Sequence, residues 1–579
     1  MLLVSRSAQA AFLLTALGTS AFAQTTSLVS ASSAGVPGDD VSYGPRISPD
    51  GRYVLFTSPA LNLAPGAADA PGESVFLRDR ASGQTSMVSV DSAGTSIGPS
   101  TAGGVSADGR YVVFETPSDV YVRDLATGVT QRAAVGANGD LPDQASVRGV
   151  LTPDGRYVAF ESRASNLVAG DTNGVADVFV RDLVNGVNER VSVSTAGAQA
   201  DQPCSFPSIS AEGRFVAFDS RASTLVAGDP AGRDVFVHDR ATGVTIRVSL
   251  GVGGAQPDHD SYLPLLSADG RVVAFTSEAT NLVPGDTTQG LDGFVHDLAT
   301  GATARVSVAT DGSEADGPSW VESISQDGRF VGITSSAPNL VAGDTNVSYD
   351  SFLYDRLACV MSRASLSAAG GEGNLNAVDA AVSADARFVA FTSAATNVVV
   401  PNPGGMQVYV RDRGTASAFV SACAGDSAPV CPCGNAGAPG RGCENSTGGG
   451  GALLVASGVA SLASDSVQVT ASGAPATALS IVLQGSALVA PVAFGDGARC
   501  AGGSLLRLYV TNASGGGLTA PAASDPAIST RSAALGDPIP LGGTRVLQVY
   551  YRDADAGFCP APQGGTFNAT NAIAVAWGS

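Results

Sequence analysis

The stretch Leu151–Ser162, LTPDGRYVAFES, decides the fold because near copies of it recur along the chain. There are seven copies in all, and the other six begin at Ile47, Val105, Ile209, Leu266, Ile324 and Val382. The starts of consecutive copies lie 58, 46, 58, 57, 58 and 58 residues apart. A fixed period of this length is typical of a repeat architecture, in which each copy is one structural unit.

Each copy predicts a turn that leads into a strand. Asp154 can hydrogen-bond to its own backbone, and Gly155 can adopt a positive φ without steric cost. The β-branched and aromatic run from Tyr157 to Phe160 predicts a largely buried strand. Downstream, DVFVRDLVNGVNERVSV from Asp177 predicts two strands joined by a Gly-containing hairpin. With the short segment before the turn, each period predicts four antiparallel strands, as in one blade of a β-propeller.

The run TPDGRYVAF (residues 152–160), followed by DVFVRD (residues 177–182), resembles the WD40-like β-propeller repeat (PD40) of the TolB family. The resemblance covers residues 25–422 and implies an all-β, seven-bladed propeller. The TolB family itself has six blades and a preceding α/β domain, and neither is visible in this sequence. Because propellers host unrelated activities, the resemblance implies a fold and no particular function.

Residues 1–23 have the pattern of a secretory signal peptide. Arg6 lies in a short leading segment, residues 10–17 are largely apolar, and Ala21-Phe22-Ala23 is a small-x-small cleavage site. This apolar run is too short to span a bilayer, and no other apolar run reaches the roughly 18 residues that a transmembrane helix needs. We therefore expect a secreted or periplasmic protein with no membrane span.

Two segments compete to supply the outer strand that closes the ring. Residues 26–46 match the segment before the fourth turn, and pairing of their first part with the final blade would remove the open edge. Ala416–Ala422, ASAFVSA, could fill the same position. The sequence leaves the choice open.

The long loops are expected to share one rim of the disc, opposite the Asp-Gly turns and hairpins, and this rim is acidic. With a net charge of −20, the chain should repel nucleic acid and attract cations or basic partners. Because function concentrates on loops held by a rigid scaffold, we expect this rim to bind a protein, peptide or glycan. The candidate ligand-binding residues are Asp258, His259, Asp260, Glu314 and Asp316.

Two of the long loops also carry a possible Ca²⁺ pattern, with oxygen-bearing side chains at relative positions 1, 3 and 7. These residues are Asp171, Asn173, Asp177, Asp344, Asn346 and Asp350. The spacing is shorter than that of an EF-hand loop, and a plain Asp/Asn/Gly turn that leads into a strand explains the same residues. Ca²⁺ is therefore an alternative to a purely structural loop, and no other cofactor is expected.

After Ala422 the repeats stop, and residues 423–579 predict a small β-sandwich. This part resembles Cys-rich C-terminal modules of secreted bacterial proteins. In an exported chain its six cysteines predict three disulfides, with fifteen possible pairings. They are Cys423, Cys431, Cys433, Cys443, Cys500 and Cys559. Cys204 and Cys359, in the repeats, are expected to be unpaired.

Hydrolytic motifs are sparse. Residues 423–579 contain neither G-x-S-x-G nor histidine, and the three histidines of the chain are His238, His259 and His296. The sequence therefore favours a non-enzymatic binding or scaffold protein that uses the acidic rim. The alternative is a cation-dependent hydrolase or lyase with a site at the propeller channel.

Overall fold

The computed structural model describes residues 24–577 except 71, 230–231, 288–289, 311, 357, 402, 415–418, 423–442, 444, 447–450, 458–459, 463–464, 495–496, 523, 541–542 and 554–566. The expected signal peptide lies outside these residues. Among the described helices, none is both long enough and apolar enough to cross a bilayer.

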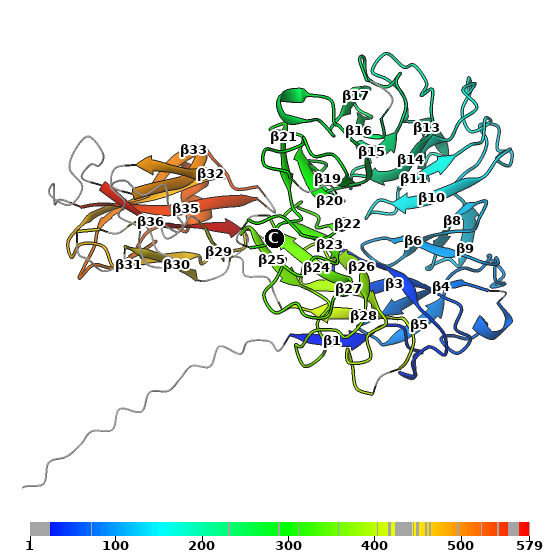
Figure 1. Cartoon of the computed structure of the whole chain (residues 1–579), viewed down its shortest axis with the longest axis horizontal. Coiled ribbons are helices and arrows are strands. Elements are labelled where there is room, and N and C mark those ends of the chain that lie inside the picture. Colours follow the sequence, from blue (N-terminus) through cyan, green and yellow to red (C-terminus); the bar gives the residue numbers. More distant parts are fainter. Residues whose placement is uncertain are drawn as a thin grey trace, which may run out of the picture.

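Seven antiparallel four-stranded sheets are formed by the described residues, and Figure 1 shows them arranged around a common centre. Six sheets take four consecutive strands each. The first three are β2 (Tyr43–Ile47), β3 (Tyr53–Ser58), β4 (Ser74–Asp79) and β5 (Gln84–Met87); β6 (Thr101–Val105), β7 (Tyr111–Glu115), β8 (Val120–Asp124) and β9 (Val129–Arg132); and β10 (Ser146–Leu151), β11 (Tyr157–Ser162), β12 (Asp177–Asp182) and β13 (Val187–Arg190). The next three are β14 (Cys204–Ile209), β15 (Phe215–Ser220), β16 (Asp234–Asp239) and β17 (Val244–Arg247); β18 (Ser261–Leu266), β19 (Val272–Ser277), β20 (Asp292–Asp297) and β21 (Ala302–Arg305); and β22 (Ser319–Ile324), β23 (Phe330–Ser335), β24 (Asp350–Asp355) and β25 (Val360–Arg363). Two short 3-10 helices, Ala67–Asp69 and Val252–Gly254, lie in the loops. The all-β prediction is confirmed.

The seventh sheet joins the two ends of the repeat region. Its strands β26 (Ala377–Val382), β27 (Phe388–Ser393) and β28 (Gln407–Asp412) are completed by β1 (Thr25–Leu28), which pairs antiparallel with β28. On its other side this sheet contacts the first one, through β2 against β26 and β27. The N-terminal segment therefore closes the ring. The competing segment instead contributes β29 (Phe419–Ala422), which pairs with a strand of the C-terminal region.

The quoted stretch forms its turn through side chains that cap the backbone. Thr152 donates a hydrogen bond to Asp154, and Asp154 accepts one from the backbone N–H of Arg156, at 3.0 Å. The strand that follows is fully buried from Val158 to Phe160. Phe160 stacks on Phe179 of the next strand, with ring centroids 5.9 Å apart. The local turn chemistry and the buried run are thus both as the sequence predicts.

The glycine of the turn is also required by the neighbouring sheet. Gly213 has φ +70°, and a Cβ there would lie 2.5 Å from Cδ2 of Tyr157 in the preceding sheet. The same close approach of a turn glycine to an aromatic ring of the previous sheet occurs at Gly51, Gly109, Gly155 and Gly270. The repeat motif Asp-Gly-Arg-aromatic therefore encodes both a turn and the contact between consecutive sheets.

Hydrogen bonds between neighbouring turns tighten this rim. The N–H groups of Ala107, Ala211 and Ala384 donate to carbonyls of the next turn at 2.8 Å, and Ala268 does so at 3.0 Å. In the first and third copies the corresponding residue is Pro49 or Pro153, which has no N–H to donate. The Asp-Gly rim thus combines these hydrogen bonds, between four of the seven pairs of neighbouring turns, with the glycine–aromatic contacts between consecutive sheets.

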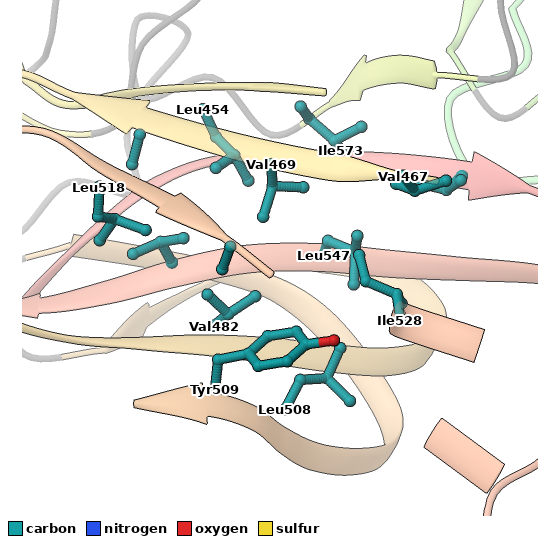
Figure 2. Close-up of a cluster of buried hydrophobic side chains, with 14 of the residues drawn as sticks. Leu454, Val467, Val469, Val482, Leu508, Tyr509, Leu518, Ile528, Leu547 and Ile573 are labelled. Atoms are coloured by element: carbon teal, nitrogen blue, oxygen red, sulfur yellow. The ribbon is translucent and has the colours of Figure 1, made fainter. Parts of the chain in front are cut away.

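The C-terminal region forms two further sheets. One contains β29, β32 (Leu479–Phe494), β33 (Gly497–Asn512), β35 (Thr544–Arg552) and β36 (Phe567–Ala576), and the other contains β30 (Leu453–Ser457), β31 (Gln468–Ser472) and β34 (Leu518–Ala520). Leu454 and Val469 of the smaller sheet share a buried cluster with Val482 and Leu547 of the larger one (Figure 2). The sheets therefore pack face to face. Strand β34 and the short helix α1 (Ile528–Ala534) were not expected from the sequence.

The cysteines are seen only in part. Cys443 and Cys500 are disulfide-bonded, whereas Cys423, Cys431, Cys433 and Cys559 lie outside the described residues. Cys204 and Cys359 are free, as expected.

We predict that Gly213→Ala destabilises the protein by roughly 2–5 kcal/mol, the sum of a left-handed alanine and an overpacked contact. Gly243, in the same sheet, is the matched control: its φ is +72°, but a Cβ there meets nothing within 4 Å. Gly243→Ala should cost only about 1–2 kcal/mol. Urea unfolding of both variants measures the difference, and equal losses would show that the contact with Tyr157 does not matter.

Candidate functional site

A cavity of about 590 Å³ lies where the seven innermost strands face one another. Its lining comes from β2, β6, β10, β14, β18, β22 and β26, the first strand of each repeat, and from Glu115 of β7. Each of these strands follows an inter-sheet connection and ends at an Asp-Gly turn, so all seven run in the same direction. Equivalent positions therefore form rings at the same depth of the channel.

A β-bulge interrupts the inner strands near their long-loop ends. The register shifts between Val147 and Val150, for example, and between Val321 and Ser323. Non-glycine residues adopt left-handed conformations at several of the bulges, namely Arg148 (φ 56°), Phe206 (54°), Leu263 (56°) and Asp379 (61°). Such residues are uncommon and cluster at functional sites. The bulges therefore mark this end of the channel as the candidate site.

Side chains of the neighbouring sheet hold the bulges in place. The Leu263 N–H donates to Asp219 at 2.9 Å, and the Gly44 N–H donates to Asp379 at 3.2 Å. The Arg148 N–H likewise donates to Glu115. These bonds pass from one sheet to the next, so each bulge is fixed by the ring itself.

One side of the channel mouth combines arginine with an aromatic ring. The Arg148 guanidinium lies 4.1 Å from the Phe206 ring centroid and pairs with Glu161 at 2.7 Å. Arg233 lies 5.6 Å from the same ring and pairs with Asp219 at 2.8 Å. Burial raises the pKa of Asp219 to about 6, although the charge of Arg233 opposes the shift.

The facing acidic side is formed by Glu322 and Asp379 from consecutive sheets. The Glu322 side chain is exposed to the space of the channel, but protein surrounds it closely. This desolvation, reinforced by the negative charge of Asp379, raises the pKa of Glu322 to about 7, while Arg46 opposes the shift. Asp379 accepts a hydrogen bond from the Thr392 hydroxyl at 2.8 Å. The channel thus holds a carboxyl group that exchanges its proton near neutral pH.

The candidate ligand-binding residues of the rim mostly make structural contacts. Asp258 accepts hydrogen bonds from the Thr280 N–H at 2.8 Å and hydroxyl at 2.6 Å. Glu314 pairs with Arg305 at 2.6 Å, and Asp260 pairs with Arg221. The backbone N–H of Asp316 donates to Asn339, and the His259 side chain is exposed, 3.5 Å from Asp258. Asp258, His259 and Asp260 belong to one connection between sheets, and Glu314 and Asp316 belong to the next.

The two loops with the possible Ca²⁺ pattern each surround an arginine. Asp344 and Glu372 both lie 2.9 Å from Arg363, and Asp350 lies 3.7 Å from it. The three carboxylates come within 4.8 Å of one another, and Asn346 donates to Asp350 at 3.0 Å.

The third sheet repeats this arrangement. Arg190 lies 2.9 Å from Asp171 and 3.8 Å from Asp177, and Asn173 donates to Asp177 at 2.7 Å. In both loops a buried guanidinium supplies the positive charge that the oxygen cluster requires.

The chain varies this cluster consistently from sheet to sheet. Arg247 pairs with Asp229 in the fourth sheet and Arg305 with Asp286 in the fifth. In the first and seventh sheets the loop lacks the acid that aligns with Asp171, and the residue in place of the arginine is apolar. Met87 packs in one cluster with Ala67 in the first sheet, and Leu28 with Val399 in the seventh. Loop acids and outer-strand arginines therefore form one structural unit.

The two strand histidines also have structural roles. His238 and His296 are buried, which lowers the pKa of each. Their Nδ1 atoms lie 2.8 Å and 2.9 Å from the hydroxyls of Thr245 and Thr303. In the third sheet, Arg181 makes the corresponding contact to Asn188.

The features that the repeats share do not predict the channel residues Arg148, Phe206, Glu322 and Asp379. The positions at which the repeats differ would have indicated these residues. The segment before each Asp-Gly turn ends in an aliphatic residue in all seven copies, but two or three positions earlier it carries arginine, phenylalanine, glutamate or aspartate in different copies.

No family model and no curated protein matches the sequence. Solved structures with a similar fold include oligogalacturonate lyase from Vibrio parahaemolyticus, at 12% identity and a TM-score of 0.42, over 67% of this chain and 97% of that chain. A TolB-type protein from Agrobacterium tumefaciens matches at 16% identity and a TM-score of 0.29, over 46% and 80%. Dipeptidyl peptidase 4 from Porphyromonas gingivalis matches at 14% identity and a TM-score of 0.35, over 62% and 57%.

Two of these three structures are enzymes, so the expectation that the chain is not an enzyme is wrong. That expectation was drawn from missing serine and histidine motifs, but a pair of carboxyl groups can also carry acid–base chemistry. At these identities and TM-scores, the matches assign neither a reaction nor a substrate to this chain.

We predict that Arg363→Met destabilises the protein by about 3–5 kcal/mol, because three carboxylates lose their buried counter-charge. Ca²⁺ should restore part of the loss, since clustered oxygens are its preferred ligands. The Tm of the wild type should be the same in Ca²⁺ and in EGTA. Thermal unfolding in both buffers is the measurement.

Arg132→Met is the matched control. Arg132 occupies the equivalent position of the second sheet, and its side chain is 38% exposed. Among the described residues its ion-pair partner is Asp119 alone, at 3.3 Å. Its loss should cost at most about 1 kcal/mol and bring no response to Ca²⁺. A rise in wild-type Tm with Ca²⁺ that Asp344→Ala removes would instead support a native metal loop.

Proposed function

We propose that the chain is an enzyme, a hydrolase or a lyase, whose site is the long-loop end of the central channel. The observation that carries this proposal is the carboxyl pair Glu322 and Asp379, which projects into a cavity opposite the Arg148–Phe206 stack. A large cavity with a few convergent polar groups is the usual setting of an active site. The left-handed backbone at Asp379 and Arg148 supports the same assignment.

In this proposal Glu322 transfers the proton. A carboxyl group with a pKa near 7 is effective at neutral pH both as an acid and as a base, because both forms are populated. The charge of Asp379 stabilises positive charge that develops on the substrate, and Arg148 orients a polar group on the opposite side. If a divalent cation takes part, Glu322 and Asp379 are the channel residues that would hold it, and it would polarise a substrate carbonyl as a Lewis acid.

The remaining features of the protein belong to the same proposal. The seven sheets are the blades of a seven-bladed, TolB-like (PD40) propeller over residues 25–422, and residues 423–579 form a sandwich with three disulfides. Residues 1–23 direct export, so the enzyme acts in the periplasm or outside the cell. Ring closure by β1 and the bonded state of Cys443 and Cys500 support these assignments.

We predict that Glu322→Gln lowers kcat by a factor of about 10²–10⁴, the usual contribution of a general acid or base. The assay is a panel of aryl esters, aryl glycosides and peptide anilides, run in EDTA and with added Ca²⁺ or Mn²⁺. For a substrate that the wild type turns over, the pH profile of kcat/KM, which reports the pKa values of the free enzyme, should bend near pH 7. The bend should be absent in the variant.

Glu212→Gln is the matched control, since Glu212 is exposed in an Asp-Gly-type turn on the opposite rim. It should leave kcat unchanged. Full activity of Glu322→Gln on a substrate of the wild type would refute the channel site.

Glu322 should also affect the stability of the protein in the absence of any substrate. The raised pKa of Glu322 means that ionising it costs free energy only in the folded state. The contribution of Glu322 to the stability of the fold is therefore fully present below the pKa of the unfolded state. It is lost as the pH rises through about 7. Glu322→Gln should raise Tm at pH 8 and have little effect at pH 5. An equal Tm difference at both pH values would show that Glu322 does not titrate as described.

A further inference from the structure

The end of the channel near the Asp-Gly turns is aliphatic all the way round. It is lined by the last residue of each inner strand, which is half-buried in every sheet except the fifth, where Leu266 is buried. These residues are Ile47, Val105, Leu151, Ile209, Leu266, Ile324 and Val382. Because all seven strands run the same way, this ring lies on the Asp-Gly side of the bulges that carry Arg148, Phe206 and Asp379. The channel is therefore polar at one end and apolar at the other.

The charges at the polar end favour a cation. Two arginines, Arg46 and Arg148, and three carboxylates, Glu115, Glu322 and Asp379, line the described cavity. Arg148 already pairs with Glu161, and Glu115 accepts hydrogen bonds from backbone N–H groups of the next sheet.

The carboxyl pair Glu322 and Asp379 lies near Arg46, in a chain whose net charge is −20. Asp379 also accepts hydrogen bonds from the Gly44 N–H and the Thr392 hydroxyl. An ammonium group between Glu322 and Asp379 would be attracted by both the local and the overall field.

We propose that the substrate of this channel is a cationic amphiphile, with an ammonium head between Glu322 and Asp379 and an aliphatic chain along the ring of inner-strand ends. This inference rests on the proposed function for the choice of site, but the binding that it describes does not require catalysis. Burial of each methylene in the aliphatic ring strengthens binding by about threefold to fourfold.

The test is calorimetric titration of the full mature chain with n-butylamine, n-hexylamine and n-octylamine, each below its micellar concentration. The matched anions are butyrate, hexanoate and octanoate. We expect the Kd of the amines to fall by about threefold to fourfold per methylene, and each carboxylate to bind at least about tenfold more weakly than the amine of the same length.

Two variants test the binding of the ammonium group and of the aliphatic chain separately. Glu322→Gln should weaken all three amines by a similar factor and leave the dependence on chain length intact. Gly104→Leu should remove that dependence by filling the space beside the aliphatic ring. The substitution is compatible with the fold, because φ of Gly104 is not positive and a Cβ there lies 3.7 Å from the Leu151 nitrogen, an ordinary contact. Glu212→Gln should change neither quantity.

Absence of any dependence on chain length, or carboxylates that bind as tightly as amines, would overturn the inference. Turnover that depends on Glu322 but is not inhibited by octylamine would overturn it as well and leave the proposed enzyme standing. Amine binding as described, in a protein that turns over nothing through Glu322, would support the inference about the ligand and contradict the proposed function.

Discussion

Every repeat of this chain forms a sheet that is apolar on both faces, and this constraint determines the rest of the structure. In the first sheet, for example, Val54, Leu55 and Phe56 are all fully buried although consecutive residues of a strand point to opposite faces. Such a sheet must be covered on both sides, and its neighbours here are copies of itself. A row of such sheets would leave two uncovered faces, whereas a ring leaves none. The pairing of β1 with β28 completes the ring.

The ring frees the inner strands for function. Contacts between sheets are made by the turn glycines, the aromatic residues that they touch, the buried strands and the aliphatic ends of the inner strands, such as Leu266 and Ile324. The bulge residues Arg148, Phe206 and Asp379 are not members of the clusters that these residues form. The bulges near the long-loop ends turn some of these residues into the channel, and polar side chains of the neighbouring sheet fix their backbone. The channel can therefore differ from sheet to sheet while the scaffold repeats. Glu322, Asp379, Arg148 and Phe206 occupy the part of the molecule where the repeats diverge.

The sequence predicted the fold well because the repeated signals are local. The Asp-Gly turn, the buried run after it and the Gly-containing hairpin each lie within a few residues, and seven copies reinforce the same interpretation. It could not decide which terminal segment closes the ring, because β1 and β28 are separated by almost the whole repeat region and both candidates have strand-like patterns. In the C-terminal region it predicted a β-sandwich, but it missed the three-residue strand β34 and the short helix α1.

The site was predicted less well, for a physical reason. The acidic residues of the long loops were predicted as possible ligands, but Asp171 pairs with Arg190 and Asp344 pairs with Arg363. Each arginine lies on the outer strand of the same sheet, 19 residues further along the chain. No local pattern links the two partners. The bulges could not be predicted either, because no local sequence pattern indicates a left-handed conformation at Arg148 or Asp379. Glu322 and Asp379 become candidates for a functional site only because the ring places them next to each other in a desolvated channel.

Hydrogen–deuterium exchange across β26–β28 tests the central claim, closure of the ring, most directly when the mature chain is compared with a variant that lacks residues 24–31. The account predicts strong protection of the β28 amides in the mature chain. In the variant, protection should be lost throughout this sheet, together with a lower Tm, because an edge and an apolar face become exposed. Unchanged exchange and Tm after the deletion would show that the N-terminal strand does not close the ring, and the arrangement of the channel described above would be wrong.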